Sequence, residues 1–350
     1  MISITFHDLL YRYRQFLIAV VGAGVVFAMA LLLTGLSNTF RVEISNTVDS
    51  VGADSWVLPE GSTGPFTSFG TLPVDSVEEV ASLPGVIQAD PLAIVPTTTV
   101  IDGDTQGLRL MGHRFGGLGT PQIVEGRAAD RSGEVVADKR LGLDVGGRFT
   151  LGSTELTVVG LAEGLTLLGG IPNVYASIDD VRDISFQGAP LITTVVTKGT
   201  PTGDAGGLTV LSTDQVQEDT LHAMEDAIAS IDNSRALMWV VAAIIVAALM
   251  YVTSLERLRD FAVLKSLGSS SRLLFAGVAA QAVTITLLAA VFALFAAKVL
   301  EPMFALPIVL PTSAFVALPI IAVVVGLLSS LVALQRAISV DPTSAFAAAQ

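Results

Sequence analysis

The sequence predicts an α-helical membrane protein with four transmembrane helices and a mixed α/β extracytoplasmic domain inserted between the first two helices. Of its 350 residues, 51% are hydrophobic and only 15% are charged, which is unusual for a soluble protein. The apolar residues gather in four stretches of at least 20 residues that lack Asp, Glu, Lys, Arg and His. Each stretch is long enough to cross a hydrocarbon core of about 30 Å. The predicted transmembrane helices are residues 16–36, 236–255, 273–297 and 312–334.

The first stretch has a second interpretation, a cleaved signal peptide. Arg12 and Arg14 precede it, and residues 28–30 read Ala-Met-Ala, which resembles a cleavage site. Its apolar core is, however, longer than the roughly 7–15 residues of such signals. Cleavage would also leave residues 31–33, all leucine, on the mature chain. We therefore favour a retained helix.

Basic residues near the ends of the stretches predict the orientation. If the helices alternate in direction, these residues fall on one side, which the positive-inside rule assigns to the cytoplasm: Arg12, Arg14, Arg257, Arg259, Lys265, Arg272 and Arg336. Both termini of a multi-pass cell-membrane protein should then be cytoplasmic. The remaining predicted segments are a cytoplasmic N-terminal segment at 1–15, an extracytoplasmic domain at 37–235, a cytoplasmic loop at 254–272, an outer loop at 298–311 and a cytoplasmic tail at 335–350.

The region after the first helix has the pattern of an acidic α/β domain. Residues 37–234 carry 27 Asp and Glu against 10 Lys and Arg, which argues against nucleic acid as a partner. The chain has no cysteine, so the domain has no disulfides. Short helices are predicted at 74–83 and 178–185. Runs of Val, Ile, Thr and Leu predict strands at 57–58, 86–101, 108–111, 134–137, 149–151, 156–161 and 191–197.

Two amphipathic patterns flank this domain, at about 37–51 and 213–232. In each, apolar residues recur at helical spacing, which predicts that the first two membrane helices extend outside the bilayer and pack together as a stalk. The alternative is that each helix covers its own part of the domain. The predicted stalk contacts are Phe40, Ile44, Val48, Val216, Met224 and Ile228.

A short charged segment, residues 254–268, separates the second and third apolar stretches. Leucine or phenylalanine recurs there every three residues, so a helix would carry one apolar stripe: Leu255, Leu258, Phe261, Leu264 and Leu267. Gly268 has the position of a helix stop. A soluble partner could bind the stripe, or the segment could be a solvated connector whose charges only set topology. The other faces carry Glu256, Arg257, Arg259, Asp260 and Lys265.

The motifs of a self-powered transporter or a hydrolase are absent from the sequence. None of the four lysines follows a glycine, so there is no phosphate-binding Walker A loop. The histidines at 7, 113 and 222 are far apart, and there is no cysteine nucleophile. We therefore expect a non-catalytic subunit with no cofactor or metal of its own, and the energy source, if there is one, to be a partner.

The central motif resembles a signature of FtsX/MacB-type ABC transporter permeases, a type VII group that includes the lipoprotein-releasing permeases. Residues 256–268, ERLRDFAVLKSLG, match the signature closely, and residues 340–346, VDPTSAF, are similar to the family's C-terminal tail. Weaker similarities to the MacB-type outer domain occur at residues 134–137, 143–146 and 156–160. The order of one helix, a large domain and three helices is also that of the family.

The resemblance implies that residues 254–268 form a coupling helix seated in a groove of a separate cytoplasmic ATPase, which binds ATP and Mg²⁺. Leu258, Phe261 and Leu264 would be the buried anchors, and the charges would fix the register: Arg257, Arg259, Asp260 and Lys265. Two ATPase copies would work with two permeases, and a homodimer is favoured over a heterodimer. Membrane lipid and an extracytoplasmic accessory protein are further candidate partners.

The function that follows is export or extraction of a hydrophobic or amphipathic substrate, such as a lipid, lipopeptide or peptide. The alternative is an FtsX-like transmitter that activates an extracytoplasmic cell-wall hydrolase without transporting a solute. A third interpretation is a membrane-anchored sensor with no ATPase.

Overall fold

The computed structural model describes residues 13–101, 103–202, 206–256, 263, 270–304 and 306–338. The chain divides into a membrane unit, residues 1–39 and 228–350, and an α/β unit, residues 40–227. Two long helices contribute residues to both units: α2 (Tyr13–Ser50) and α6 (Glu225–Glu256).

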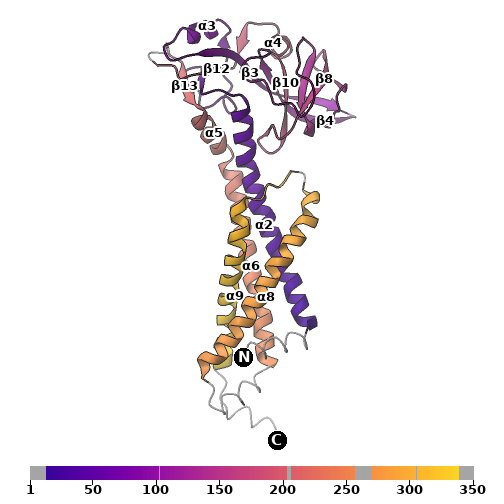
Figure 1. Cartoon of the computed structure of the whole chain (residues 1–350), viewed down its shortest axis with the longest axis vertical. Helices are drawn as coiled ribbons and strands as arrows, with labels where there is room; N and C mark the ends of the chain where they lie inside the picture. The colour runs from indigo at the N-terminus through magenta and orange to yellow at the C-terminus, as the bar shows by residue number, and fades with distance from the viewer. Residues whose placement is uncertain are drawn as a thin grey trace. The chain divides into compact units, whose positions relative to one another are not determined.

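The membrane unit is built from α2, α6, α8 (Ser271–Leu300) and α9 (Thr312–Ile338), with a short η2 (Glu301–Met303) after α8 (Figure 1). These four helices are long and apolar enough to cross a membrane, which confirms the predicted number of spans. The four predicted charge-free stretches lie one within each helix. Helical structure satisfies every backbone N–H and C=O inside the segment, which hydrocarbon requires.

Small residues bring the membrane helices close together. A Cβ at Gly24 of α2 would lie 2.6 Å from the ring of Phe292 in α8. A Cβ at Gly326 of α9 would lie 2.9 Å from Cα of Val283 in α8. The Ser329 hydroxyl donates a hydrogen bond to the Ala243 carbonyl at 3.0 Å and so joins α9 to α6. Without a hydrophobic force between helices in lipid, such close contacts hold the bundle together.

The loop between α8 and α9 is attached to α2 by hydrogen bonds. The Thr39 hydroxyl donates to the Pro307 carbonyl at 2.9 Å and accepts from the Val309 backbone N–H at 3.0 Å. The Asn38 amide donates to the Val309 carbonyl at 3.0 Å. These bonds give the backbone groups of Pro307 and Val309, which lie outside the helices, the hydrogen-bond partners that buried backbone groups require.

The α/β unit contains an 11-stranded mixed sheet (Figure 1). Its path runs β13-β1-β12-β3-β4-β10-β6-β8-β5, with β7 beside β8 and β9 beside β10. The β4–β10 and β6–β8 pairs are parallel and the other pairs antiparallel. The strands are β1 (Ser55–Leu58), β3 (Gln88–Ile101), β4 (Asp104–His113), β5 (Glu125–Gly126), β6 (Glu134–Asp138), β7 (Arg148–Leu151), β8 (Thr154–Ala162), β9 (Thr166–Leu167), β10 (Ile171–Ser177), β12 (Thr194–Lys198) and β13 (Thr209–Ser212).

The remaining elements of this unit are short. A two-stranded sheet pairs β2 (Leu72–Pro73) with β11 (Leu191–Ile192). The helices are α3 (Ser76–Ala81), η1 (Lys139–Leu141), α4 (Ile178–Phe186) and α5 (Thr213–His222). A capping box starts α5, because the Ser212 and Gln215 side chains bond each other's backbone N–H groups.

Alternate residues of the central strands face two different cores, as the pleat requires. On one face, Leu110 of β4 packs in a cluster with Val181 of α4. On the other face, Met111 of β4 packs in a cluster with Ile44 and Val48 of α2. Helix α5 adds Val216 to this second cluster. The sheet is therefore covered by α4 and, through Val77 and Val80, by α3 on one side and by α2 and α5 on the other.

The strands predicted from Val, Ile, Thr and Leu runs are present, although predicted strand 191–197 is split into β11 and β12. The sequence analysis did not predict the short strands β2, β5, β9 and β13, nor β10, which lies between β4 and β6 at the centre of the sheet. Its sequence, IPNVYAS, contains proline and asparagine, both of which are rare in central strands. Tertiary pairing with two neighbours outweighs this weak local preference.

Burial of His113, near the second core, predicts a pH-dependent stability of the α/β unit. The side chain is 3% exposed, and burial lowers its pKa to about 4. The unfolded chain takes up a proton near pH 6.5 and the folded chain does not. The free energy of unfolding should therefore fall as the pH drops from about 6.5 to about 4, by up to about 1.4 kcal/mol per pH unit.

The measurement is denaturant unfolding in detergent, followed by the fluorescence of Trp56 in a Trp239→Phe background. Trp56 is fully buried in the cluster of Ile44 and Met111. His113→Gln should flatten the pH dependence in this window, because it removes the imidazole that takes up a proton there only in the unfolded chain. Equal slopes with and without His113 would show this prediction to be wrong.

Candidate functional site

The predicted coupling segment lies mostly outside the described residues. Glu256 is the exposed last residue of α6, and α8 begins at Ser271 after an N-cap in which Ser270 accepts from the Leu273 N–H. Between Glu256 and Ser270, Val263 is the one described residue; it is helical and its side chain is 45% exposed. The other predicted coupling residues fall outside the described ranges: Arg257, Leu258, Arg259, Asp260, Phe261, Leu264, Lys265 and Gly268.

Three of the predicted stalk residues come together in the α/β unit. Ile44, Val48 and Val216 belong to one buried cluster, so α2 and α5 share a core with the sheet. Phe40 is buried at 7% exposure and Met224 is half-buried. The Gln217 amide donates to the Asp49 carboxylate at 2.8 Å, which is a direct polar contact between α2 and α5. Ile228, also buried, belongs to the membrane unit.

A polar seam, formed by Glu43, Thr47, Thr166 and Asn173, joins α2 to β9 and β10. The buried Glu43 carboxylate accepts from the Thr166 hydroxyl at 2.7 Å and from the Gly170 N–H at 3.2 Å. The Thr47 hydroxyl donates to the Thr166 carbonyl at 2.7 Å and accepts from the Asn173 amide at 3.4 Å. The sequence analysis did not predict this seam. It could have been predicted from Glu43 and Thr47, two polar residues four positions apart that lie beside an apolar stripe.

Arg109 of β4 lies close to this interface without a carboxylate partner in the described residues. Its side chain is 3% exposed and its guanidinium lies 5.7 Å from the centre of the Phe66 ring. Burial lowers the pKa of Arg109 to about 10. In the described part of the chain, its Nη1 has no hydrogen-bond partner. The cation–π contact offsets part of the cost of burying this charge.

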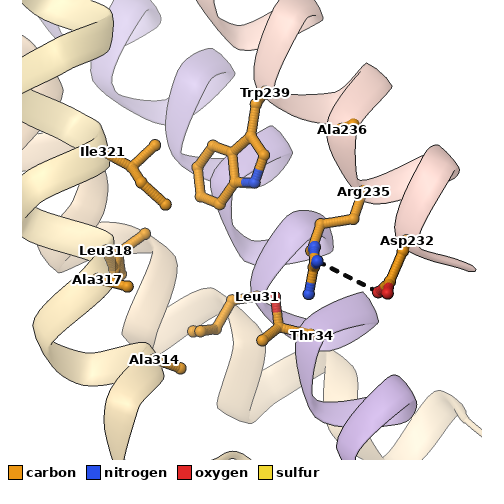
Figure 2. Close-up of a pocket in the computed structure, with 10 residues that line it drawn as sticks. All are labelled: Leu31, Thr34, Asp232, Arg235, Ala236, Trp239, Ala314, Ala317, Leu318 and Ile321. Carbon is orange, nitrogen blue, oxygen red and sulfur yellow. Dashed lines mark ion pairs between the residues drawn. The ribbon is translucent and has the colours of Figure 1, made fainter.

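The membrane unit contains a cavity of about 340 Å³ between α2, α6 and α9 (Figure 2). α2 contributes Leu31 and Thr34. α9 contributes Ala314, Ala317, Leu318 and Ile321. The side of α6 that faces the cavity carries Asp232, Arg235, Ala236 and Trp239, which recur at the three- and four-residue spacing of one helix face. We call this space the outer-end cavity, because its residues lie at the same end of three spans, the end that the distribution of basic residues predicts to face outward.

The outer-end cavity is polar at one end and apolar at the other. Arg235 Nη2 lies 3.2 Å from Asp232 Oδ1, and these two side chains are 32% and 38% exposed. The contact is an ion pair without hydrogen-bond geometry, since Asp232 Oδ1 is buried and accepts no hydrogen bond in the described residues. At the other end, Trp239 packs against Phe27 with ring centres 5.3 Å apart. Figure 2 shows the ion pair on one side and Trp239 with Ile321 on another.

The sequence analysis did not identify this cavity. The signal was available in α6, where Asp232, Arg235 and Trp239 follow each other on one face immediately before and inside the second span. Which residues of α2 and α9 they meet depends on helix packing. Among the described residues, no group of three His, Cys, Asp or Glu side chains is placed to hold a metal ion.

Comparison with protein families gives two matches that together cover most of the chain. Residues 16–226 match the MacB-like periplasmic core domain, and residues 236–342 match the C-terminal part of FtsX-like permeases. An uncharacterised ABC transporter permease of Mycobacterium bovis is 38% identical over 348 residues, which is 99% of each chain. A second uncharacterised ABC transporter permease, from Mycobacterium tuberculosis, is 37% identical over the same share.

Two solved structures resemble part of the chain. The periplasmic region of MacB from Actinobacillus actinomycetemcomitans is 14% identical, with a TM-score of 0.36, over 50% of this chain and 96% of that one. The extracellular domain of the transporter YknZ from Gram-positive bacteria is 14% identical, with a TM-score of 0.33, over 50% of this chain and 93% of that one.

The contact between α2 and α5 predicts a specific crosslink. The chain has no cysteine, so Asp49→Cys with Gln217→Cys gives a clean background. A short bis-methanethiosulfonate reagent should join the two positions in high yield. The control pair, Asp49→Cys with Glu218→Cys, moves the second thiol to the neighbouring exposed position, where the helix turns it away. Equal yields from the two pairs would contradict the described packing.

Proposed function

Because the chain belongs to the FtsX/MacB-type family of ABC transporter permeases, we propose that it couples ATP hydrolysis by a separate ATPase to movement of its extracytoplasmic domain. The movement would export an amphipathic substrate or extract it from the membrane. The chain would be a non-catalytic subunit, with its N- and C-termini in the cytoplasm. It would work with a second permease copy and two ATPase copies, which bind the ATP and Mg²⁺.

The observation that carries the proposal is that one helix supplies buried residues to both units. Phe27 and Leu31 of α2 lie in the core of the membrane unit, while Ile44 and Val48 lie in the core of the α/β unit. The polar seam at Glu43 and Thr47 adds directional bonds between α2 and the sheet. A displacement of α2 along its axis would therefore have to break these bonds or move the strands with it.

The input would come through the coupling helix. Its apolar stripe, with Leu258, Phe261 and Leu264 as anchors, would seat in a groove of the ATPase. The neighbouring charges of the segment would form pairs at the rim of the groove and fix the register. Closure of the ATPase pair around ATP would then displace α6, whose last residues, Ser254 to Glu256, are the first residues of this segment.

The outer-end cavity supports an amphipathic substrate. It combines one ion pair with a lining of alkyl and indole groups, which suits a molecule with a polar head and an apolar body. The charge-free stretches of the four spans favour a mechanical stroke over an ion relay, because ion pathways usually keep ionisable groups inside the membrane.

One observation favours the second candidate function, a signal transmitter without a cargo. On the α/β unit, the side chains of Phe69 and Ile87 are 91% and 84% exposed. Apolar side chains that are exposed together mark sites of protein association. An extracytoplasmic partner, such as a cell-wall hydrolase, that covers either of these side chains would respond to the same ATPase stroke.

Purification in mild detergent followed by an ATPase assay tests the proposal and separates the two functions. Export predicts a co-purifying ATPase that lipid or lipopeptide extracts stimulate. Transmission predicts an ATPase that responds only to an extracytoplasmic protein. If no ATPase copurifies from the cells in which the protein naturally occurs, the coupling role is wrong.

Phe261→Asp should abolish association with the ATPase, because it would place a charge in an apolar groove at a cost of several kcal/mol. Val263→Asp is the matched control: it lies outside the apolar stripe, its side chain is 45% exposed, and it should leave association within about twofold of the wild type. The measurement is the ratio of ATPase to permease after affinity purification. Co-purification of the Phe261→Asp protein at the wild-type ratio would rule out the coupling-helix assignment.

A further inference from the structure

We propose that the outer-end cavity binds a zwitterionic phospholipid, with Arg235 on the phosphate and Asp232 on the ammonium group of the head. Trp239, Leu31, Leu318 and Ile321 would hold the first part of an acyl chain. The inference rests on the proposed export function, which it deepens by naming the class of amphiphile and the residues that select it.

The cavity lies at the level of the membrane where lipid headgroups meet the hydrocarbon. Arg235 directly precedes the charge-free stretch 236–255, Thr34 lies near the end of 16–36, and Ala314 lies near the start of 312–334. In helices that alternate in direction, these three ends lie on the same side of the membrane. The boundary between headgroup and hydrocarbon should therefore cross the cavity between Arg235 and Trp239.

The polar end has free capacity for a phosphate. A guanidinium group has five N–H donors in a planar fork that matches phosphate oxygens. In the outer-end cavity, the charged partner of Arg235 is Asp232, whose Oδ1 lies 3.2 Å from Nη2 without hydrogen-bond geometry. The Thr34 hydroxyl donates its proton to the Ala30 carbonyl of its own helix at 2.8 Å. A phosphate oxygen in the cavity would therefore take its hydrogen bonds from Arg235.

The charge of the pair selects the headgroup. Asp232 and Arg235 together are neutral, so for an anion alone the attraction of the guanidinium is offset by the repulsion of the carboxylate, and for an amine alone the reverse holds. A phosphoethanolamine head carries one charge of each sign and complements both residues at once. Although Asp232 Oδ1 is buried against Arg235, the Asp232 side chain is 38% exposed, and the ammonium group would meet the accessible part of this carboxylate.

The volume limits how much of the lipid enters. About 340 Å³ is near the lower end of small-molecule cavities, which run from about 300 to about 1,000 Å³. The cavity therefore holds a headgroup and part of one chain, and the rest of the lipid remains in the bilayer. The alanines at 314 and 317 keep the space open, because a larger side chain at either position would fill it.

Quenching of Trp239 fluorescence by brominated lipids tests the inference on the full chain in nanodiscs. Phosphatidylethanolamine and phosphatidylglycerol with the same brominated chains are titrated at low mole fraction. The difference between wild type and Trp239→Phe isolates the signal of the cavity from that of Trp56. A charged hydrogen-bonded contact is worth about 1.5–3 kcal/mol, so half-saturation should need about tenfold less phosphatidylethanolamine than phosphatidylglycerol.

Three variants assign the preference to the ion pair. Arg235→Ala and Asp232→Asn should each abolish it. The matched control is Arg148→Ala, which removes a surface arginine of the α/β unit that pairs with Glu155 at 3.9 Å. This variant should retain the preference for phosphatidylethanolamine. Equal quenching by both lipids in the wild type would overturn the inference.

Two other outcomes would also overturn it. If no brominated lipid quenches Trp239, lipid does not occupy the cavity. If chainless glycerophosphoethanolamine displaces the lipid at comparable concentrations, the acyl chain contributes nothing and the ligand is a soluble phosphoester.

An ATPase assay on the complex separates this inference from the proposed function. A headgroup preference that depends on Arg235, together with an ATPase that lipid does not stimulate, would establish the lipid site and exclude the export role. Lipid-stimulated ATPase activity that is unchanged in Arg235→Ala and Asp232→Asn would support export and overturn the headgroup site.

Discussion

The burial of α2 in two different cores is the constraint on which the rest of the structure depends. In residues 16–36 the helix must pair all its backbone groups internally and carry no charge, because the hydrocarbon offers no partner. From Phe40 onward the same helix packs on a sheet, where polar groups are allowed if they are bonded. Ile44 and Val48 supply apolar contact there, while Glu43 and Thr47 supply hydrogen bonds to the β9–β10 region. One continuous 38-residue helix thus meets two sets of physical requirements along its length.

The polar seam adds something that apolar packing alone lacks. Apolar contacts tolerate a shift of one helix against a sheet, because they have no preferred direction. The bonds of Glu43 and Thr47 to Thr166 exist in one register only, and breaking them would leave a buried carboxylate without partners. For a protein proposed to transmit motion, such a joint keeps α2 and the strands moving together. The buried Arg109 lies nearby in the same unit and relies on a ring contact with Phe66 instead.

The outer-end cavity shows how a residue can have two roles that look alike in a sequence. Arg235 directly precedes the second charge-free stretch, and a charge at that position is expected simply because the helix enters the hydrocarbon there. In the structure it also faces a cavity with Asp232 and Trp239, so its charge borders an apolar space. The distinction matters because a solvated boundary charge has no ligand, whereas one that lines a cavity can select a headgroup. The two roles are distinguished by the residues of α2 and α9 that line the cavity beside Arg235, and these cannot be read from the sequence around Arg235.

The sequence by itself determined the four membrane spans, the family and most of the strands, because hydrophobic runs and β-branched runs are local properties of the chain. The tertiary structure decided which of these elements meet. Strand β10 pairs with β4 and β6 despite its Pro172 and Asn173, since pairing on both edges outweighs local preference. The cavity combines Leu31, Arg235 and Leu318, residues from three helices far apart in the sequence. Periodicity shows that a helix has an apolar face, but the neighbour that covers this face is set by packing among distant segments.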